Sequence, residues 1–512
     1  METKVPAVSM RGITKIFGRN VVANDHVDLD IYKGEILALL GENGSGKTTL
    51  MNMLAGIYFP DEGQILIDGK PVVIRSPRDA FDNHIGMIHQ HFKLVDLLTA
   101  AENIVLGLDG KLDLKAASSR IRDICSKFGF DVDPDQKIYD MSVSQKQTVE
   151  IVKALYRGAD ILILDEPTAV LTPQETDKLF AVLRSMKESG KAIIIITHKM
   201  QEVLSLSDRV AVLRSGQFVG DLVTKDTNAQ EMTDMMVGHS VTLNIERPEP
   251  VDPKPRLEVM DLTVRTEDGI LKLDHVSFTA NSGEILGIAG ISGCGQKELL
   301  EAIAGLQHTQ EGEVYYIEDD GCRESLIGKD PLKIAEMGVV LSFVPEDRLG
   351  MGLVGNMDLT DNMMLRSFRK GRSIFTDRKT PRNVAQNVIH DLEVNTPGVN
   401  TPVRRLSGGN VQKVLVGREI NASPTVLLTA YAVRGLDINS SYTIYDLINR
   451  QKKDGVAVIY VGEDLDVLLE IADRILVICD GKVSGILDGR TADKREIGML
   501  MTHIGGKVNE QA

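Results

Sequence analysis

The chain has 512 residues, of which 43% are hydrophobic and 26% charged, and its formal net charge is −15. This balance is typical of a globular protein, and the length predicts about two to four domains. The acidic excess argues against a protein held on nucleic acid by phosphate contacts.

The cysteines and the first residues indicate the compartment. Cys125, Cys294, Cys322 and Cys479 lie far apart and form no CxxC pair, which favours a reduced compartment and argues against structural zinc. The first residues, METKVPAVSMRG, lack the apolar core of a secretory signal. No apolar run approaches the ~18 residues of a membrane span. We therefore expect any action at a membrane to depend on partner proteins.

The first aromatic side chain of interest is Phe17, in the stretch KIFGRN. An exposed ring at this place would stack on adenine, provided that a nucleotide site follows in the chain. A buried aromatic at the end of a strand is the alternative, and the residue alone leaves both open.

The next segment has the order strand, loop and helix. Residues 35–40, EILALL, form an apolar run typical of a buried strand, and apolar residues after position 48 recur at helical spacing. Between them lies a match to G-x-x-x-x-G-K-[ST], made of Gly41, Glu42, Asn43, Gly44, Ser45, Gly46, Lys47 and Thr48. The flanking strand and helix argue against a chance match, so we predict a phosphate-binding loop.

This loop predicts ATP and Mg²⁺ as ligands. Glycines let the backbone wrap closely around a phosphate, and amides at the start of the helix face the anion. Lys47 supplies a positive charge for the β- and γ-phosphates, and Thr48 offers its hydroxyl to Mg²⁺.

Gln90 follows directly after a predicted strand in the stretch IGMIHQHF. His84, His89 and His91 lie near it. No fourth ligand or carboxylate pattern accompanies these histidines, so the sequence does not predict a metal site among them.

Two further strands are predicted to end in polar residues. The run ILIL before Asp165 leads to a pair of acids, where Asp165 would hold Mg²⁺ opposite Thr48 and Glu166 would act as general base toward water. A solvated strand end is the alternative for this pair. The run AIIII is followed by Thr197 and His198, and the imidazole would sense the γ-phosphate or position the water. A structural histidine is the alternative there.

The sequence is duplicated. KGEILALLGENGSGKTTLMNMLAG around Gly41 recurs as SGEILGIAGISGCGQKELLEAIAG around Gly290. Between the copies, residues 246–255 carry four prolines, which suit a stiff and extended linker. Each half alternates apolar strand runs with helical patterns, which predicts an α/β domain with a largely parallel sheet. We expect domains at residues 1–245 and 257–512, joined by a linker at 246–256.

These motifs, in this order and spacing, resemble the nucleotide-binding domain of ABC transporters. They are the phosphate-binding (Walker) loop, Gln90, SVSQ, LDEPT and ITH. The doubled form resembles the tandem ATP-binding subunits of bacterial sugar and nucleoside importers, over roughly residues 5–505. The resemblance implies two P-loop NTPase domains, each with a helical subdomain. It also implies that Gln90 contacts Mg²⁺ and takes part in catalysis.

The second copy departs from the pattern at its chemical groups. Aligned with Lys47, Thr48, Gln90, Asp165, Glu166 and His198 stand Gln296, Lys297, Glu346, Ala430, Tyr431 and Glu463. We therefore expect the second domain not to hydrolyse ATP with its own residues.

The second copy nevertheless keeps Ser407, Gly408, Gly409 and Asn410, which resemble the LSGGQ signature of the family. The hydroxyl and amides of such a segment, at the start of a helix, bind a γ-phosphate. In the first copy Ser144 takes the place of the second glycine. ABC domains pair head to tail, so the resemblance implies one complete site, made of the first domain's Walker groups and Ser407–Asn410, and one degenerate site.

The sequence thus predicts an ATPase that drives a membrane importer. Partners would be two permease subunits and an extracytoplasmic substrate-binding lipoprotein, with the chain at the cytoplasmic face of the membrane and no nucleic acid involved. Stretches such as HQHFKLVDLLTAAENIVLG look more like the nucleoside branch than the ribose or galactose branch. A soluble tandem ABC ATPase of translation or DNA repair and a catalytically inactive scaffold are the alternatives. The first would show basic arms or two competent sites, and the second would lack the complete first site.

Overall fold

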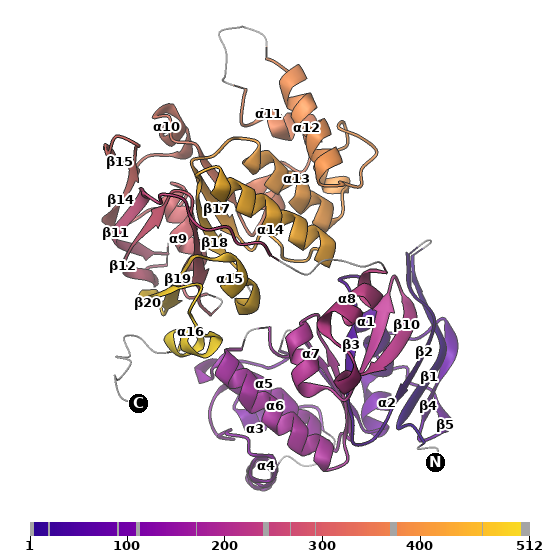
Figure 1. The fold of residues 1–512 in the computed structure, drawn as a ribbon. Coiled ribbons are helices and arrows are strands. Elements are labelled where there is room, and N and C mark those ends of the chain that lie inside the picture. Colours follow the sequence, from indigo (N-terminus) through magenta and orange to yellow (C-terminus); the bar gives the residue numbers. More distant parts are fainter. Residues whose placement is uncertain are drawn as a thin grey trace. The chain divides into compact units, whose positions relative to one another are not determined.

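The computed structural model describes residues 5–18, 21–89, 92–108, 113–169, 171–238, 245–266, 268–291, 293–368, 376–462 and 464–502. The chain divides into two compact units, Met1–Thr242 and Leu243–Ala512, here called unit 1 and unit 2. Each unit contains an antiparallel sheet, a mainly parallel sheet and helices that cover them (Figure 1).

Unit 1 contains two sheets. The antiparallel sheet has the order β2-β1-β4-β5, and the larger sheet has the order β10-β9-β3-β8-β7-β6, parallel except for the edge hairpin β9–β10. The strands are β1 (Val8–Phe17), β2 (Val21–Ile31), β3 (Ile36–Leu40), β4 (Glu62–Ile67), β5 (Lys70–Val72), β6 (Ile85–Ile88), β7 (Ile161–Asp165), β8 (Ala192–Ile196), β9 (Arg209–Arg214) and β10 (Gln217–Val223).

The helices of unit 1 cover both faces of the larger sheet. They are α1 (Lys47–Leu54), α2 (Pro77–Asp82), α3 (Ala100–Val105), α4 (Leu114–Phe128), α5 (Val143–Tyr156), α6 (Pro173–Glu188), α7 (Met200–Leu206) and α8 (Ala229–Val237). One apolar cluster joins α1 to both sheets, and a second joins the opposite face of the larger sheet to α5 and α6. A third cluster joins α3, α4 and α5 into a helical subdomain.

Burial on both faces explains why the central strands are apolar throughout. All five residues of β3, β7 and β8 are buried. In β7, Ile161 and Ile163 face the α1 cluster, while Leu162 and Leu164 face the cluster with α5 and α6. This alternation is that of a strand between two layers, where near-continuous apolar runs are expected. Since β3, β8 and β7 are neighbours and parallel, their carboxyl ends meet at one edge.

Unit 2 repeats this plan, with sheets in the orders β12-β11-β14-β15 and β16-β17-β18-β13-β19-β20. Its strands are β11 (Pro255–Arg265), β12 (Leu271–Asn281), β13 (Ile285–Ala289), β14 (Glu311–Ile317), β15 (Arg323–Ser325), β16 (Leu341–Val344), β17 (Val426–Ala430), β18 (Ala457–Val461), β19 (Arg474–Cys479) and β20 (Lys482–Asp488). Its helices are α9 (Gln296–Ile303), α10 (Pro331–Glu336), α11 (Leu359–Met364), α12 (Lys379–Asp391), α13 (Gly408–Ile420), α14 (Ile438–Lys453), α15 (Leu465–Ile471) and α16 (Lys494–Leu500), with a π-helical turn η3 (Arg348–Gly352). The predicted α/β class, with two largely parallel sheets and helical subdomains, is confirmed.

The proline-rich segment, residues 246–255, belongs to unit 2 and packs against the rest of that unit. Ile245 is buried in its core cluster. The Arg247 guanidinium donates to the carbonyl oxygens of Leu469, Ala472 and Gly489 at 3.0, 2.6 and 3.1 Å. The segment expected to be a stiff and extended linker is anchored at its start, and β11 already begins at Pro255.

Candidate functional site

The phosphate-binding loop of unit 1 connects β3 to α1. Lys47 is the first residue of α1, and its Nζ atom donates to the carbonyl oxygens of Gly41 at 2.7 Å and Glu42 at 2.9 Å. Its side chain is buried, and this burial lowers the pKa of Lys47. The loop therefore holds a cation inside a ring of its own backbone, at the start of a helix whose amides favour an anion.

The shape of the loop depends on glycine. Gly46 has φ 94°, and a Cβ atom built there would lie 2.2 Å from the carbonyl oxygen of Ala23. Gly44 has φ 82°, but its Cβ would meet nothing within 4 Å. Gly46 is thus required both for its left-handed backbone and for space, whereas the surface at Gly44 is open, as a loop that receives a phosphate needs to be.

Thr48 and Asp165 place two oxygen atoms together beside this loop. The Thr48 hydroxyl lies 3.5 Å from Asp165 Oδ1, although the two residues come from α1 and the end of β7. Burial, and then the neighbouring Glu166 carboxylate, raise the pKa of Asp165 to about 6. A hydroxyl and a carboxylate fit Mg²⁺, which takes oxygen ligands and screens phosphate charge.

Glu166 and His198 form the second polar pair at this edge. His198 Nδ1 lies 3.0 Å from Glu166 Oε1, and this hydrogen bond is the main reason that the pKa of Glu166 lies below its usual value. Glu166 has φ 45°, a conformation uncommon for a residue with a side chain, and its amide donates to the carbonyl oxygen of Ile196. The turn therefore directs an ionised, oriented carboxylate out of the strand end, as a general base requires.

Phe17 is the last residue of β1 and is half-buried. Its ring meets the ring of Tyr58 edge to face, with centroids 5.1 Å apart, and Lys15 Nζ lies 5.6 Å from its centroid. The ring is thus neither fully exposed nor fully buried, and its contact with adenine stays a prediction. Thr266 stands at the aligned position of unit 2, which has no aromatic ring there.

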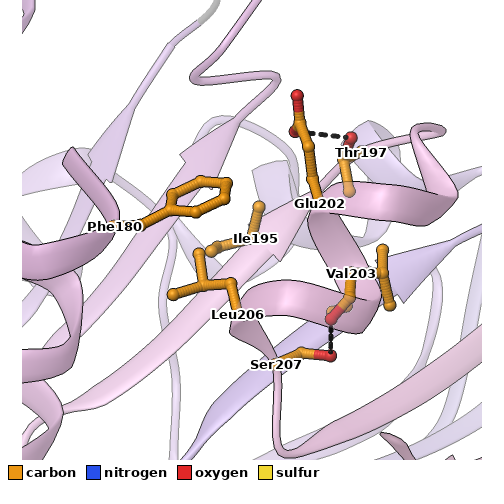
Figure 2. Close-up of a pocket in the computed structure, with 8 residues that line it drawn as sticks. Phe180, Ile195, Thr197, Glu202, Val203, Leu206 and Ser207 are labelled. Carbon is orange, nitrogen blue, oxygen red and sulfur yellow. Dashed lines mark hydrogen bonds between the residues drawn. The ribbon is translucent and has the colours of Figure 1, made fainter. Parts of the chain in front are cut away.

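Two residues singled out from the sequence, Gln90 and Glu463, lie outside the described residues. A hollow of about 10 Å³ lies beneath Thr197, lined by Ala38, Phe180, Ile195, Glu202, Val203, Leu206 and Ser207 (Figure 2). It has room for no more than one water molecule, so it is part of the packing rather than a ligand pocket.

Unit 2 has lost the cation of its loop. Gln296 is buried where unit 1 has Lys47, and its Nε2 atom donates to the carbonyl oxygen of Ile291 at 3.2 Å. Lys297 does not replace the missing charge, because it pairs with Glu301 along α9 at 3.7 Å. The loop is kept in shape by a neutral amide.

The acidic edge of unit 2 is likewise replaced. Ala430 ends β17, and Tyr431 follows with φ 54°, close to the value of Glu166. Arg434 lies over the Tyr431 ring at 5.9 Å and pairs with Glu346. An arginine and an aromatic ring therefore occupy the region where unit 1 presents a carboxylate.

The segment Ser407–Asn410 forms the N-terminus of α13. The Ser407 hydroxyl caps the helix and receives a hydrogen bond from Asn410 Nδ2 at 2.8 Å. In unit 1, the Ser142 hydroxyl also caps its helix, α5, and there it forms a capping box with Gln145. Both signature segments therefore start a helix, but only the segment of unit 2 carries glycines after its serine.

Sequence reasoning missed Arg348. Its guanidinium donates to the carbonyl oxygens of Gly408, at 3.0 Å, and Arg434. Arg348 thus links the segment after Glu346 to the start of α13. It stands two residues after Glu346 in VPEDR, but no local pattern shows that this arginine meets a loop about 60 residues further on.

A protein-family model described as "ABC transporter" matches residues 24–169 and 273–429 of the chain. The Nucleoside import ATP-binding protein NupA of Lactococcus lactis subsp. cremoris is 41% identical, over 98% of this chain and 99% of its own. The Glucose import ATP-binding protein TsgD13 of Haloferax volcanii is 39% identical, over 98% and 96%. The Guanosine import ATP-binding protein NupO of Bacillus subtilis is 40% identical, over 96% and 97%.

Among solved structures, the complex of archaeal ribosomal stalk protein aP1 and archaeal ribosome recycling factor aABCE1 matches with a TM-score of 0.61 and 16% identity. The match covers 93% of this chain and 90% of that chain, and at this identity it shows the fold alone. The family resemblance predicted from the motifs is confirmed by the family model and by the curated relatives. The chain therefore belongs to the ABC transporter family and carries its ATPase domain twice.

Proposed function

We propose that this chain is the ATP-hydrolysing subunit of a membrane importer for nucleosides, and that unit 1 carries the hydrolytic residues. The observation that carries the proposal is the edge formed by β3, β7 and β8, where Lys47, Thr48, Asp165, Glu166 and His198 lie together. The aligned edge of unit 2 lacks these groups.

Each residue at this edge has a proposed role. The loop Gly41–Thr48 binds the phosphates of ATP, Phe17 stacks on the adenine, and Lys47 contacts the β- and γ-phosphates. Thr48, Asp165 and Gln90 hold Mg²⁺, which would screen phosphate charge during transfer. Glu166 takes a proton from the attacking water. His198 and Gln90 together orient Glu166 and the γ-phosphate. The 3.0 Å contact between His198 Nδ1 and Glu166 Oε1 supports the roles proposed for these two residues.

We also propose that Ser407, Gly408 and Gly409, at the start of α13, bind the γ-phosphate of ATP. The asymmetry of the chain supports this arrangement: unit 2 keeps the glycine-rich helix start while it has lost the Walker groups nearby. Random decay of a spare domain would not be expected to spare one and remove the other.

The partners follow from the family. Relatives named as import ATP-binding proteins imply permease subunits in the membrane. We propose two of them, together with an extracytoplasmic substrate-binding lipoprotein, and place the chain at the cytoplasmic face. Within the part of the chain that the structure describes, no helix is long and apolar enough to cross a membrane.

The solute is tested by uptake. Deletion of the gene is expected to abolish uptake of labelled nucleosides, and the wild-type gene on a plasmid to restore it. A plasmid with Lys47→Ala is the matched control, expected to restore protein but not uptake. Loss of ribose, galactose or glucose uptake with intact nucleoside uptake would contradict the nucleoside assignment, and the names of the curated relatives leave a sugar importer as the alternative.

A further inference from the structure

The carboxylate of Glu202 joins the two loops that follow β7 and β8. The Thr168 hydroxyl donates to Glu202 Oε1 at 2.5 Å, and the Thr197 hydroxyl donates to Oε2 at 3.4 Å. Figure 2 shows the Glu202 carboxylate beside Thr197. Both threonines are buried, and the Glu202 side chain is only 15% exposed. A carboxylate in such a place costs free energy unless its oxygens are hydrogen-bonded, as they are here.

Both threonines stand next to the proposed hydrolytic residues. Thr168 comes two residues after Glu166, and Thr197 immediately precedes His198. Glu166 and His198 lie 3.0 Å apart, so a shift of either loop changes that distance directly. Glu202 thus links the loop of Glu166 to the loop of His198, and it also pairs with Lys199, the residue after His198, at 3.2 Å.

The backbone of these loops does not depend on Glu202. In both units the residue after the strand has a positive φ, its amide bonds to the next strand, and a glutamine side chain holds the following carbonyl. The amide bonds are Glu166 to Ile196 and Tyr431 to Val461, both 2.9 Å, and the glutamine bonds are Gln147 to Pro167 at 2.6 Å and Gln412 to Ala432 at 2.7 Å.

Unit 2 shares this backbone turn but lacks the contact that Glu202 makes with the two threonines. Its residues aligned with Thr168, Thr197 and Glu202 are Val433, Gly462 and Val467. Val433 and Val467 pack against the apolar core cluster of that unit. The same turn therefore forms with an apolar filling, and the polar contact is present only where the hydrolytic side chains are present.

We propose that Glu202 is a positioning residue for ATP hydrolysis: by tying the loop of Glu166 to the loop of His198, it keeps their side chains within hydrogen-bonding distance. The inference rests on the roles proposed above for Glu166 and His198. Glu202 acts through the two threonines and does not contact the nucleotide.

The test is the steady-state phosphate release of the full chain. Glu202→Ala and Thr168→Val are each expected to lower kcat by about 10- to 100-fold, the cost of a misplaced catalytic group. KM for ATP is expected to stay within about twofold, because a group that acts only in the transition state changes kcat and not binding. Thr168→Ser, which keeps the hydroxyl, is expected to retain the parent rate. The double variant is expected to be no slower than Glu202→Ala, since Glu202→Ala already breaks the contact that Thr168→Val removes.

Glu35→Gln provides a matched control. Glu35 is also 15% exposed and pairs with Arg209 at 2.9 Å, but it precedes β3 and so lies at the opposite end of the sheet. The Glu35→Gln variant is expected to have a lower thermal stability than the parent but the same kcat. If Glu202→Ala does not fold, Thr168→Val and Thr168→Ser carry the test.

A kcat within about twofold of the parent in Glu202→Ala and Thr168→Val would overturn the proposal, and so would a double variant whose loss is the product of the single losses. Equal loss in Thr168→Ser and Thr168→Val would also overturn it. Glu166→Gln, measured alongside, separates this inference from the proposed function. If Glu166→Gln stops turnover while the Glu202 variants do not, only the positioning role fails. If Glu166→Gln turns over normally, the role of Glu166 fails first.

Discussion

Glu166→Gln removes the charge of the proposed base while it preserves nearly everything else. The glutamine has the same shape, its oxygen still meets His198 Nδ1, and the backbone bond from residue 166 to Ile196 is unaffected. The charge-assisted hydrogen bond with His198 is weakened, so we expect a loss of stability of about 0.5–1.5 kcal/mol. The loop around Lys47, which we propose to hold the phosphates, is untouched, so ATP binding is expected to persist.

The effect on hydrolysis is expected to be much larger. A positioned base contributes about 10²–10⁴-fold to the rate. At 1.36 kcal/mol for each factor of ten, this corresponds to about 3–5 kcal/mol of barrier, several times the expected loss of stability. The activity loss therefore cannot be explained by unfolding of the variant.

The assay is single-turnover phosphate release with equilibrium ATP binding and a thermal melt on the same preparation. Tyr431→Phe is the matched control at the aligned position of unit 2, and it is expected to keep the parent rate because Ala430 leaves that edge without its first acid. Turnover of Glu166→Gln near the parent rate would refute the argument that Glu166 is the base.

Three further predictions concern the loop, the signature and the metal. Gly46→Ala should cost about 1–3 kcal/mol of backbone strain plus a clash with Ala23, seen as a lower melting temperature and lost ATP binding, whereas Gly44→Ala should show only the strain. Ser407→Arg should reduce phosphate release nearly as far as loss of the loop lysine. Ser142→Arg, which removes the same kind of helix cap worth about 1 kcal/mol, should reduce it less, and equal losses would contradict the asymmetry. Chelation with EDTA should stop phosphate release and added Mg²⁺ should restore it; full activity in EDTA would show that no divalent cation is needed.

Much of the fold could be predicted because the chain repeats strong local signals. Runs such as ILIL before Asp165 are apolar at every position, which indicates a strand buried on both faces. The glycines and Lys47 occupy a fixed spacing that only a strand, a loop and a helix satisfy together. Because the sequence is duplicated, alignment of the two copies predicts the fold of unit 2 and places Gln296 at the position of Lys47.

Two of the contacts that sequence reasoning missed join distant residues. Glu202 meets Thr168 across 34 positions, and Arg348 meets Arg434 across 86. No periodicity predicts which carboxylate or guanidinium reaches a given loop, because the partners are brought together by the sheet order and not by local spacing. The prolines before β11 likewise indicate extended backbone, but they do not say what surface the segment lies on.

The anchored segment before β11 decides where unit 2 begins as an independently folding body. Without residues up to 256, the core would lose Ile245, and the carbonyl oxygens at the end of α15 would lose the guanidinium of Arg247. Lys452, which is buried beside Asp473, would lose its bond to the Pro248 carbonyl. A gene fragment that expressed this half alone would therefore have to start at or before Ile245, and a separation of the two halves in evolution would have had to cut the chain ahead of the prolines.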